Sequence, residues 1–182
     1  MKQKKPGAYD ENGNILCSLT KADIESKGSP FENYDISTTE IKEVILPSNT
    51  RKIGDWTFFD CVSLSSIQLP SGLIEIGANA FKDCSSLISI AIPDNVMSIG
   101  EWAFAGCSSL VDIRIPQNIN TIEEYTFARC SSLSVITIPD SVNTIKEGAF
   151  WNCSSLKSVS IPDSVTEIDS SAFLLCPFSV AT

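Results

Sequence analysis

At 182 residues the chain has the length of a single domain, and its 43% hydrophobic and 19% charged residues are ordinary for a folded protein. Its net charge of −9 and 13 scattered Lys and Arg residues argue against a nucleic-acid partner, because phosphate binding needs clustered basic side chains. No apolar run approaches the roughly 20 residues that span a bilayer, so we expect no membrane insertion, and the basic start is not followed by the apolar core of a signal peptide.

Residues 1–40 lack the periodicity that fills the rest of the chain. The dipeptide Asn12-Gly13 is a hairpin-turn signal. Thr20 and Asp23 have the spacing of a capping box, which predicts a short helix. We therefore predict that this segment forms an N-terminal cap built from a hairpin and a short helix.

The segment 41–182 repeats with a period of 23 residues and no insertion. One proline column and one phenylalanine column mark the period: Pro47, Pro70, Pro93, Pro116, Pro139 and Pro162, and Phe58, Phe81, Phe104, Phe127, Phe150 and Phe173. A fixed period of this size is the signature of stacked repeat units, because one unit cannot bury its apolar face alone. We predict a repeat solenoid of six coils.

Each coil begins with a short strand, shown by Leu87, Ile90 and Ile92 ahead of a proline that ends the pairing. Equivalent strands should stack in parallel. The positions between the buried ones point outward and form what we call the strand face: Glu43/Ile45, Ser66/Gln68, Ser89/Ala91, Asp112/Arg114, Val135/Thr137 and Ser158/Ser160. Its central part, from Ser66 to Thr137, is one candidate binding surface for a protein partner, and an ordinary solvated face is the alternative.

Later in the coil, Ala103, Phe104 and Cys107 fall on one side of a short helical or 3-10 turn on the outer face. Six cysteines recur at the same interval: Cys61, Cys84, Cys107, Cys130, Cys153 and Cys176. Equivalent side chains on adjacent coils point the same way about 4.8 Å apart, whereas a disulfide needs facing Cβ atoms about 3.8 Å apart. We expect buried free thiols and, without His or a C-x-x-C pair, no metal or other cofactor.

Aromatic residues form a second candidate surface beside the outer turn. Trp56, Trp102 and Tyr125 share one column, and Trp151 shares another with Phe59. Partly exposed aromatic rings stack on sugars or anchor protein interfaces. The alternative is that they shield the rim of the coils.

The pattern L-x-x-I-x-I-P-x-x-V-x-x-I-G-x-x-A-F-x-x-C-S-S, as in Leu87 to Ser109, resembles the BspA-like class of leucine-rich repeats, and the resemblance covers residues 41–178. It implies a curved solenoid with short parallel strands on the inner face. It also implies a secreted or cell-surface bacterial protein that adheres to host or matrix proteins.

Without His, the Ser-His and Cys-His forms of nucleophilic catalysis are excluded, and we expect no enzyme activity. The first hypothesis for function is a protein-binding or adhesion-type scaffold. The second is a carbohydrate-binding module that uses the exposed aromatics. The third is a self-associating segment that forms an edge-to-edge homodimer through the open strand edge of its C-terminal coil.

Overall fold

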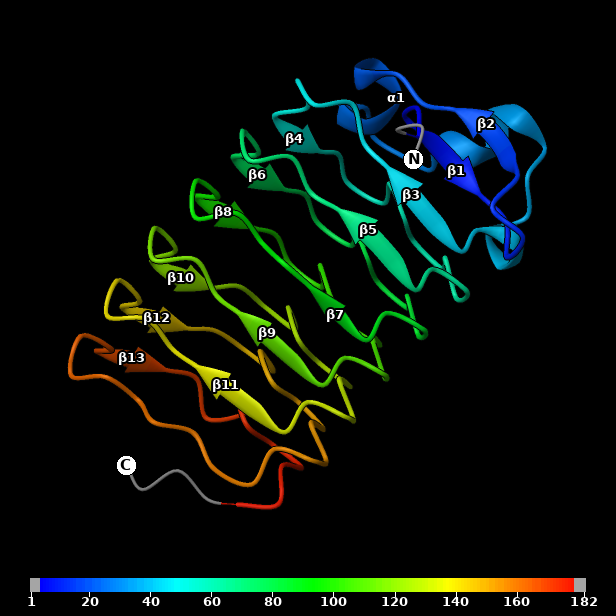
Figure 1. Cartoon of the computed structure of the whole chain (residues 1–182). Helices are drawn as coiled ribbons and strands as arrows, with labels where there is room; N and C mark the ends of the chain where they lie inside the picture. Colours follow the sequence, from blue (N-terminus) through cyan, green and yellow to red (C-terminus); the bar gives the residue numbers. More distant parts are fainter. Residues whose placement is uncertain (1–3, 179–182) are drawn as a thin grey trace.

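The computed structural model describes residues 4–178, and its repeat region is a stack of coils (Figure 1). The first five coils carry two short strands each, and the sixth carries one strand, with an isolated bridge at Ser160 in place of the other. The first ladder contains β3 (Glu43–Ile45), β5 (Ser66–Gln68), β7 (Ser89–Ile90), β9 (Asp112–Arg114) and β11 (Val135–Thr137). The second contains β4 (Lys52–Ile53), β6 (Glu75–Ile76), β8 (Ser98–Ile99), β10 (Thr121–Ile122), β12 (Thr144–Ile145) and β13 (Glu167–Ile168). Paired strands of different coils are parallel and join residues one repeat apart, such as Ile90 and Ile113. The predicted solenoid is confirmed.

Each ladder divides into two hydrogen-bonded groups. In the first ladder β3 pairs with β5, and β7, β9 and β11 form a second group. In the other, β4, β6 and β8 form one group and β10, β12 and β13 the next. We had expected the second ladder only as a stretch that returns the chain across the core. Its strands are two residues long, which is too short for an alternating pattern to be recognised in the sequence.

The outer segment of each coil differs from the expected helical turn. Within residues 41–178 it contains turns and no helix. Two residues four positions apart adopt the left-handed backbone conformation in five of the coils: Trp56 and Asp60, Asn79 and Asp83, Trp102 and Gly106, Tyr125 and Arg129, and Gly148 and Asn152. A helix cannot contain such residues, because L-amino acids in a right-handed helix need negative φ.

Hydrogen bonds between coils explain why the outer segment is not helical. The N–H groups of Trp102, Phe104 and Gly106 donate to carbonyls of the following coil at 2.8–2.9 Å. A helix would direct these groups to carbonyls within the same segment. Here these N–H groups alternate with others that bond within the segment, such as Ala105 to Trp102, so the outer segments form a third connection along the stack.

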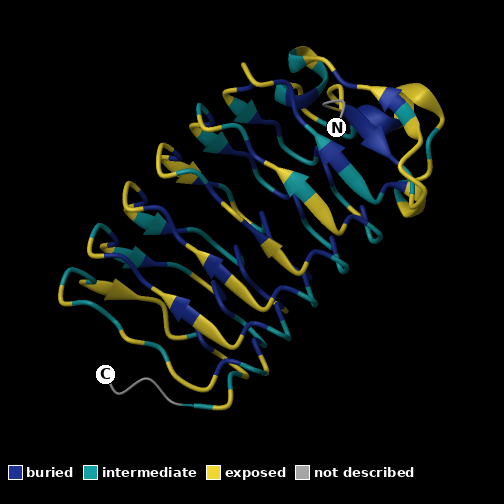
Figure 2. Ribbon diagram, viewed as in Figure 1, coloured by how far each residue is buried: buried dark blue, intermediate teal, exposed yellow. Residues whose placement is uncertain are grey.

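The core is a continuous column of phenylalanine rings. The six repeat phenylalanines, Phe58 to Phe173, stack with centroids 5.1–5.8 Å apart and interplanar angles of at most 20°. Phe31 of the N-terminal segment extends the column beyond Phe58 at 6.0 Å, and Phe178 covers Phe173 at 5.7 Å. Both end rings are tilted, so the column ends where the repeat geometry ends. The buried residues run through the interior of every coil (Figure 2).

The residues before 41 lie over the first coil (Figure 1). They form β1 (Gly7–Tyr9), β2 (Ile15–Ser18), α1 (Lys21–Glu25), and the 3-10 turns η1 (Pro30–Tyr34) and η2 (Thr38–Glu40). Strands β1 and β2 are an antiparallel hairpin, and β1 also pairs antiparallel with β3. Thr20 and Asp23 make the reciprocal bonds of a capping box at α1. This arrangement covers the N-terminal edge of the first ladder.

The helix end and the first coil approach closely at Gly54. A Cβ atom at this position would lie 1.7 Å from the carbonyl oxygen of Ser26, which no side chain could accommodate. The Gly54 N–H donates to the carbonyl of Ile24 at 2.8 Å. Glycine is therefore required here for close contact between backbones.

The cysteine column is a ladder of hydrogen-bond donors. Each thiol from Cys84 to Cys176 lies 3.1–3.2 Å from the carbonyl oxygen of a phenylalanine in the preceding coil. The Phe81 carbonyl, for example, accepts both the Cys84 N–H and the Cys107 thiol. Burial raises the pKa of Cys61 and Cys130 to about 12, so these thiols stay protonated at neutral pH.

We expect Phe104→Ala to lower the free energy of unfolding by about 3–5 kcal/mol, because it removes a fully buried ring that stacks on both sides. Urea titration followed by circular dichroism measures the change. Phe178→Ala is the control, since this half-buried ring contacts only the end of the column. An equal loss in the two variants would contradict a cooperative phenylalanine column.

We expect Thr50→Val to stabilise the protein by about 1 kcal/mol. Thr50 is fully buried, and its hydroxyl has no hydrogen-bond partner among the described residues. Valine keeps the shape and removes the desolvated hydroxyl. Thr57→Val is the matched control: Thr57 is also fully buried, but its hydroxyl donates to the Gly54 carbonyl at 2.8 Å, so this variant should be destabilised by about 1 kcal/mol. Thermal denaturation should show a raised melting temperature for Thr50→Val and a lowered one for Thr57→Val.

We expect alkylation to modify Cys176 faster than the other repeat cysteines. This thiol is half-buried, whereas the other five repeat thiols are buried. The rate of iodoacetamide labelling, followed by peptide mass spectrometry, should rise with pH at Cys176 before any other repeat cysteine reacts, since only the thiolate attacks. Equal labelling of Cys107, which is fully buried and has a raised pKa, would show that the coils open on the time scale of labelling.

Candidate functional site

All eight residues predicted for the central strand face are exposed in the structure: Ser66, Gln68, Ser89, Ala91, Asp112, Arg114, Val135 and Thr137. The register brings Ser89, Asp112 and Val135 into one row across β7, β9 and β11. Ser66 and Gln68 stand beside residues of β3 instead. Figure 2 shows exposed positions beside buried ones in β7, β9 and β11. The strand face is therefore an ordered surface whose side chains stand in rows.

Three exposed apolar residues lie on the strand face or directly before its strands, and we call them the apolar cluster, which we did not recognise in the sequence. Ile88 is 57% exposed, Val111 45% and Val135 60%. Val111 donates its N–H to the Ile88 carbonyl at 3.1 Å, and Val135 stands beside Asp112 in the register. The column of Ile88 and Val111 is polar in the other coils, with Lys42, Ser65, Ser134 and Lys157. Two aliphatic residues in a polar column were the signal in the sequence.

Charged residues border the apolar cluster. The Arg114 guanidinium lies 2.9 Å from the Asp94 carboxylate of the preceding coil, and both groups are exposed. Asp112 stands between Ser89 and Val135. A small apolar centre beside charged groups has the composition of a protein interaction surface.

The predicted aromatic residues are all half-buried, and several pack on one another. The rings of Trp102 and Tyr125 are stacked with centroids 4.3 Å apart, and Trp56 packs edge-on against Phe59 at 5.1 Å. We call these four residues the aromatic edge. The Tyr125 hydroxyl donates to Glu147, and this bond to a carboxylate raises the pKa of Tyr125. Among residues 4–178 no ring pairs with Trp151, so it stays apart from this cluster.

The ammonium group of Lys82 lies over the aromatic edge. Its nitrogen is 4.7 Å from the ring centroid of Trp102 and 5.9 Å from those of Trp56 and Phe59. Lys82 belongs to the coil before Trp102 and Tyr125 to the coil after it, so the two groups lie on opposite sides of the Trp102 ring. Sugar stacking needs a free ring face, and Trp102 offers none while Lys82 is in place.

A groove runs across the coils where the second ladder meets the outer turns. Its volume is about 510 Å³, and residues from five coils line it. Four carboxylates and one ammonium group border it: Asp55, Glu75, Glu101, Glu123 and Lys146. Gly77 and Gly100 lie along its floor, where a Cβ would come within 2.5 Å of Asp55 or of the Ala78 backbone. We did not predict this groove, because its members are scattered through the repeat and meet only after stacking.

Two ion pairs lie at the groove. The Lys52 nitrogen is 2.7 Å from the Glu75 carboxylate, and Lys146 is 2.6 Å from Glu123. These hydrogen bonds to carboxylates raise the pKa of both lysines. Asp55 accepts the N–H of Ala78 at 3.0 Å, whereas Glu101 is exposed, and neither makes an ion pair with another described residue.

Residues 4–178 contain no group of three His, Cys, Asp or Glu side chains arranged to hold a metal ion. In the same range no helix has the length and apolar character to span a bilayer.

Comparison with known proteins gives family and structural matches, but no relative among curated proteins. A sequence model of the BspA type leucine-rich repeat region matches in six copies over residues 14–93 and 53–179. The match thus begins inside the segment 1–40 and reaches almost to the end of the chain.

Solved bacterial leucine-rich repeat proteins share the fold. A leucine-rich repeat protein of T. pallidum is 34% identical in sequence, with a TM-score of 0.66. The match covers 71% of this chain and 61% of that one. The Eubacterium ventriosum protein is 29% identical with a TM-score of 0.62, over 78% and 44%. The Bacteroides ovatus protein is 27% identical with a TM-score of 0.58, over 72% and 40%. The matched region is thus less than two thirds of each of these proteins. The six-copy match over most of the sequence shows that the chain belongs to the BspA-type leucine-rich repeat family.

Proposed function

We propose that the chain is a non-enzymatic, adhesion-type scaffold that binds a protein partner, such as a host or matrix protein, through its strand face. The observation that carries this proposal is the exposed apolar cluster of Ile88, Val111 and Val135. Exposed aliphatic side chains gain free energy when a partner covers them, and Asp112 and Arg114 beside them supply orientation.

The strand face is also preorganised for binding. Its backbone is held in the parallel ladder of β7, β9 and β11. Ile88, Val111 and Val135 are β-branched, so their side chains have few rotamers to lose when a partner binds. Little conformational entropy is therefore lost on association, and more of the burial energy appears as affinity.

Double substitution of the apolar cluster tests the proposal. We expect Ile88→Lys with Val111→Lys to weaken binding of the partner at least about tenfold, or about 1.4 kcal/mol, because two charges would be desolvated at the centre of the interface. The partner is sought in a panel of purified extracellular-matrix and serum proteins by surface plasmon resonance with the wild-type chain.

The matched control is Ile74→Lys with Met97→Lys. These residues are 45% and 66% exposed and stand in one column on the side of the second ladder. The control should change the affinity less than about twofold, since it adds the same charge outside the proposed interface. Equal weakening by both double variants, or no ligand in the panel, would refute binding through the strand face.

A further inference from the structure

The second ladder is interrupted between the third coil, residues 87–109, and the fourth coil, residues 110–132. Within residues 4–178 its hydrogen-bonded groups are β4 with β6 and β8, and β10 with β12 and β13, so the pairing stops between β8 and β10 (Figure 1). The Cα atoms of β8 and β10 also stand farther apart than those of any other neighbouring strands in this ladder. We call this place the seam.

Backbone N–H groups that are paired in the other coils are unpaired at the seam. Glu123 shares a column with residues whose N–H groups donate to a carbonyl of the preceding coil at 2.8–3.0 Å: Gly77, Gly100, Lys146 and Asp169. Its own N–H has no acceptor among the described residues. The same holds for the N–H of Asn120, whereas Asn143, one repeat later, donates to the Asn120 carbonyl at 2.8 Å. The interruption is therefore confined to the fourth coil.

The core is also widest at the seam. The ring centroids of Phe104 and Phe127 are 5.8 Å apart, whereas the other neighbouring rings of the repeat are 5.1–5.4 Å apart. The two rings still lie parallel, with an interplanar angle of 5°. The coils are thus moved apart at the seam while the phenylalanine column continues through it.

The Cβ atom of Glu123 explains the wider spacing. Gly77 and Gly100 precede Glu123 in its column, and a Cβ at either glycine would lie 2.5 Å from an atom of the preceding coil. Glu123 carries this atom, so the fourth coil cannot approach the third as closely as the third approaches the second. Lys146 and Asp169 continue the column, and their strands pair with that of Glu123. The seam therefore falls where the column changes from glycine to larger residues.

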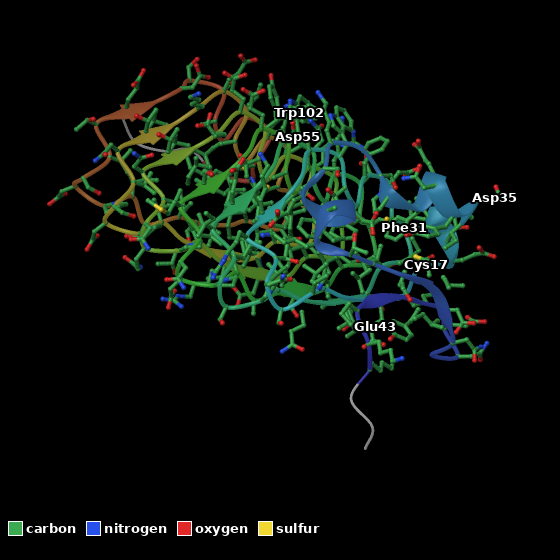
Figure 3. All side chains as sticks on the ribbon, turned by 90° about the horizontal axis from the view of Figure 1, so that it is seen from above. Cys17, Phe31, Asp35, Glu43, Asp55 and Trp102 are labelled. Atoms are coloured by element: carbon green, nitrogen blue, oxygen red, sulfur yellow. The ribbon has the colours of Figure 1, made fainter. Side chains whose placement is uncertain are left out.

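Two of the three connections between coils persist at the seam. In the first ladder β7 pairs with β9, and the Val111 N–H donates to the Ile88 carbonyl at 3.1 Å. On the outer side the N–H groups of Trp102, Phe104 and Gly106 donate to the fourth coil at 2.8–2.9 Å. Trp102 marks this outer segment at the edge of the molecule in Figure 3. Two lines of bonds leave one rotation free, about the axis through both, and this rotation opens or closes the second ladder.

We propose that the seam is a hinge between two blocks, residues 4–109 and 110–178. Rotation at the seam changes the angle between the third and fourth coils, which carry Ile88 and Val111 of the apolar cluster. The hinge lets the strand face change its curvature to follow the surface of a partner. What the motion does for binding rests on the function proposed above, whereas the hinge itself does not.

Amide hydrogen exchange of the full chain, followed by NMR, tests whether the seam is open. After correction for the intrinsic rate of each residue, we expect the Glu123 amide to exchange at least about 100-fold faster than the Lys146 amide, because only Lys146 donates to the preceding coil. The Asn120 amide should exceed the Asn143 amide for the same reason. Equal protection within each pair would mean that the seam is paired and that the proposal is wrong.

Glu123→Gly tests the cause of the seam. It extends the glycine column by one coil, so β10 should approach β8, and the amides of residues 120 and 123 should exchange at least about tenfold more slowly. Lys146→Gly is the matched control, because either substitution removes the ion pair of Glu123 and Lys146, whose charged groups are 2.6 Å apart. The control should leave both amides within about twofold of their original rates. Equal effects of the two variants, or no slowing in Glu123→Gly, would overturn the role of the Glu123 Cβ.

Spin labels measure the motion itself without any partner. Lys27 and Glu167 are exposed and belong to different blocks. A ketone-bearing residue at each of these positions takes a label without modifying the cysteines. Double electron–electron resonance should give a distance distribution at least about 1.5-fold broader with Glu123 in place than in the Glu123→Gly background. Equal widths would show a static gap and no hinge.

The link to the strand face is measured with the same labels. With a protein ligand from the panel bound, the distance distribution should narrow, because the partner selects one curvature. A distribution that stays broad in the complex would show that the hinge does not act on the strand face. Failure of the strand face to bind any ligand would leave the exchange and distance results of the free chain unchanged, so the two proposals are tested separately.

Discussion

Every coil in this chain depends on its neighbours for its backbone hydrogen bonds and for the burial of its phenylalanine. The two strands of a coil are at most three residues long, and every second N–H group of its outer segment donates to the next coil. A single 23-residue unit would leave these donors and both faces of its ring in water. Stability therefore arises between coils, as expected for a solenoid with nearest-neighbour interactions.

This constraint explains why the period never varies. An inserted residue would shift the register of both strand ladders, the outer hydrogen bonds and the thiol ladder together. The thiol of Cys107 reaches the Phe81 carbonyl because the two residues are always one repeat and three positions apart. The same register stacks the rings of Phe81 and Phe104 at 5.3 Å. The period is therefore strict because both strand ladders, the outer hydrogen bonds and the thiol hydrogen bonds all need the same register.

Features in which one repeat position stacks on the same position of the next coil were predictable from the sequence. Features that join different repeat positions, or residues outside the repeat, were not. The phenylalanine, proline and cysteine columns predicted the solenoid because each column stacks on itself. Phe31 was missed because it extends the ring column from outside the repeat. The left-handed residues were missed because Trp56, Trp102 and Tyr125 are bulky residues that rarely adopt this conformation. The groove and the packing of Lys82 over Trp102 join different columns of neighbouring coils.

The candidate surfaces arise where a coil departs from the repeat. Ile88 and Val111 replace polar residues of their column and, with Val135, add exposed apolar area at the strand face. Gly77 and Gly100 precede Glu123, Lys146 and Asp169 in one column, so the groove has a bare floor in some coils and charged side chains in the others. Ile88 and Val111 are exposed, so their column can change without loss of the fold, whereas a Cβ at Gly77 or Gly100 would lie 2.5 Å from the preceding coil. The interior of this solenoid therefore specifies its shape, while the departures from the repeat lie on its surface, where we propose that it binds a partner.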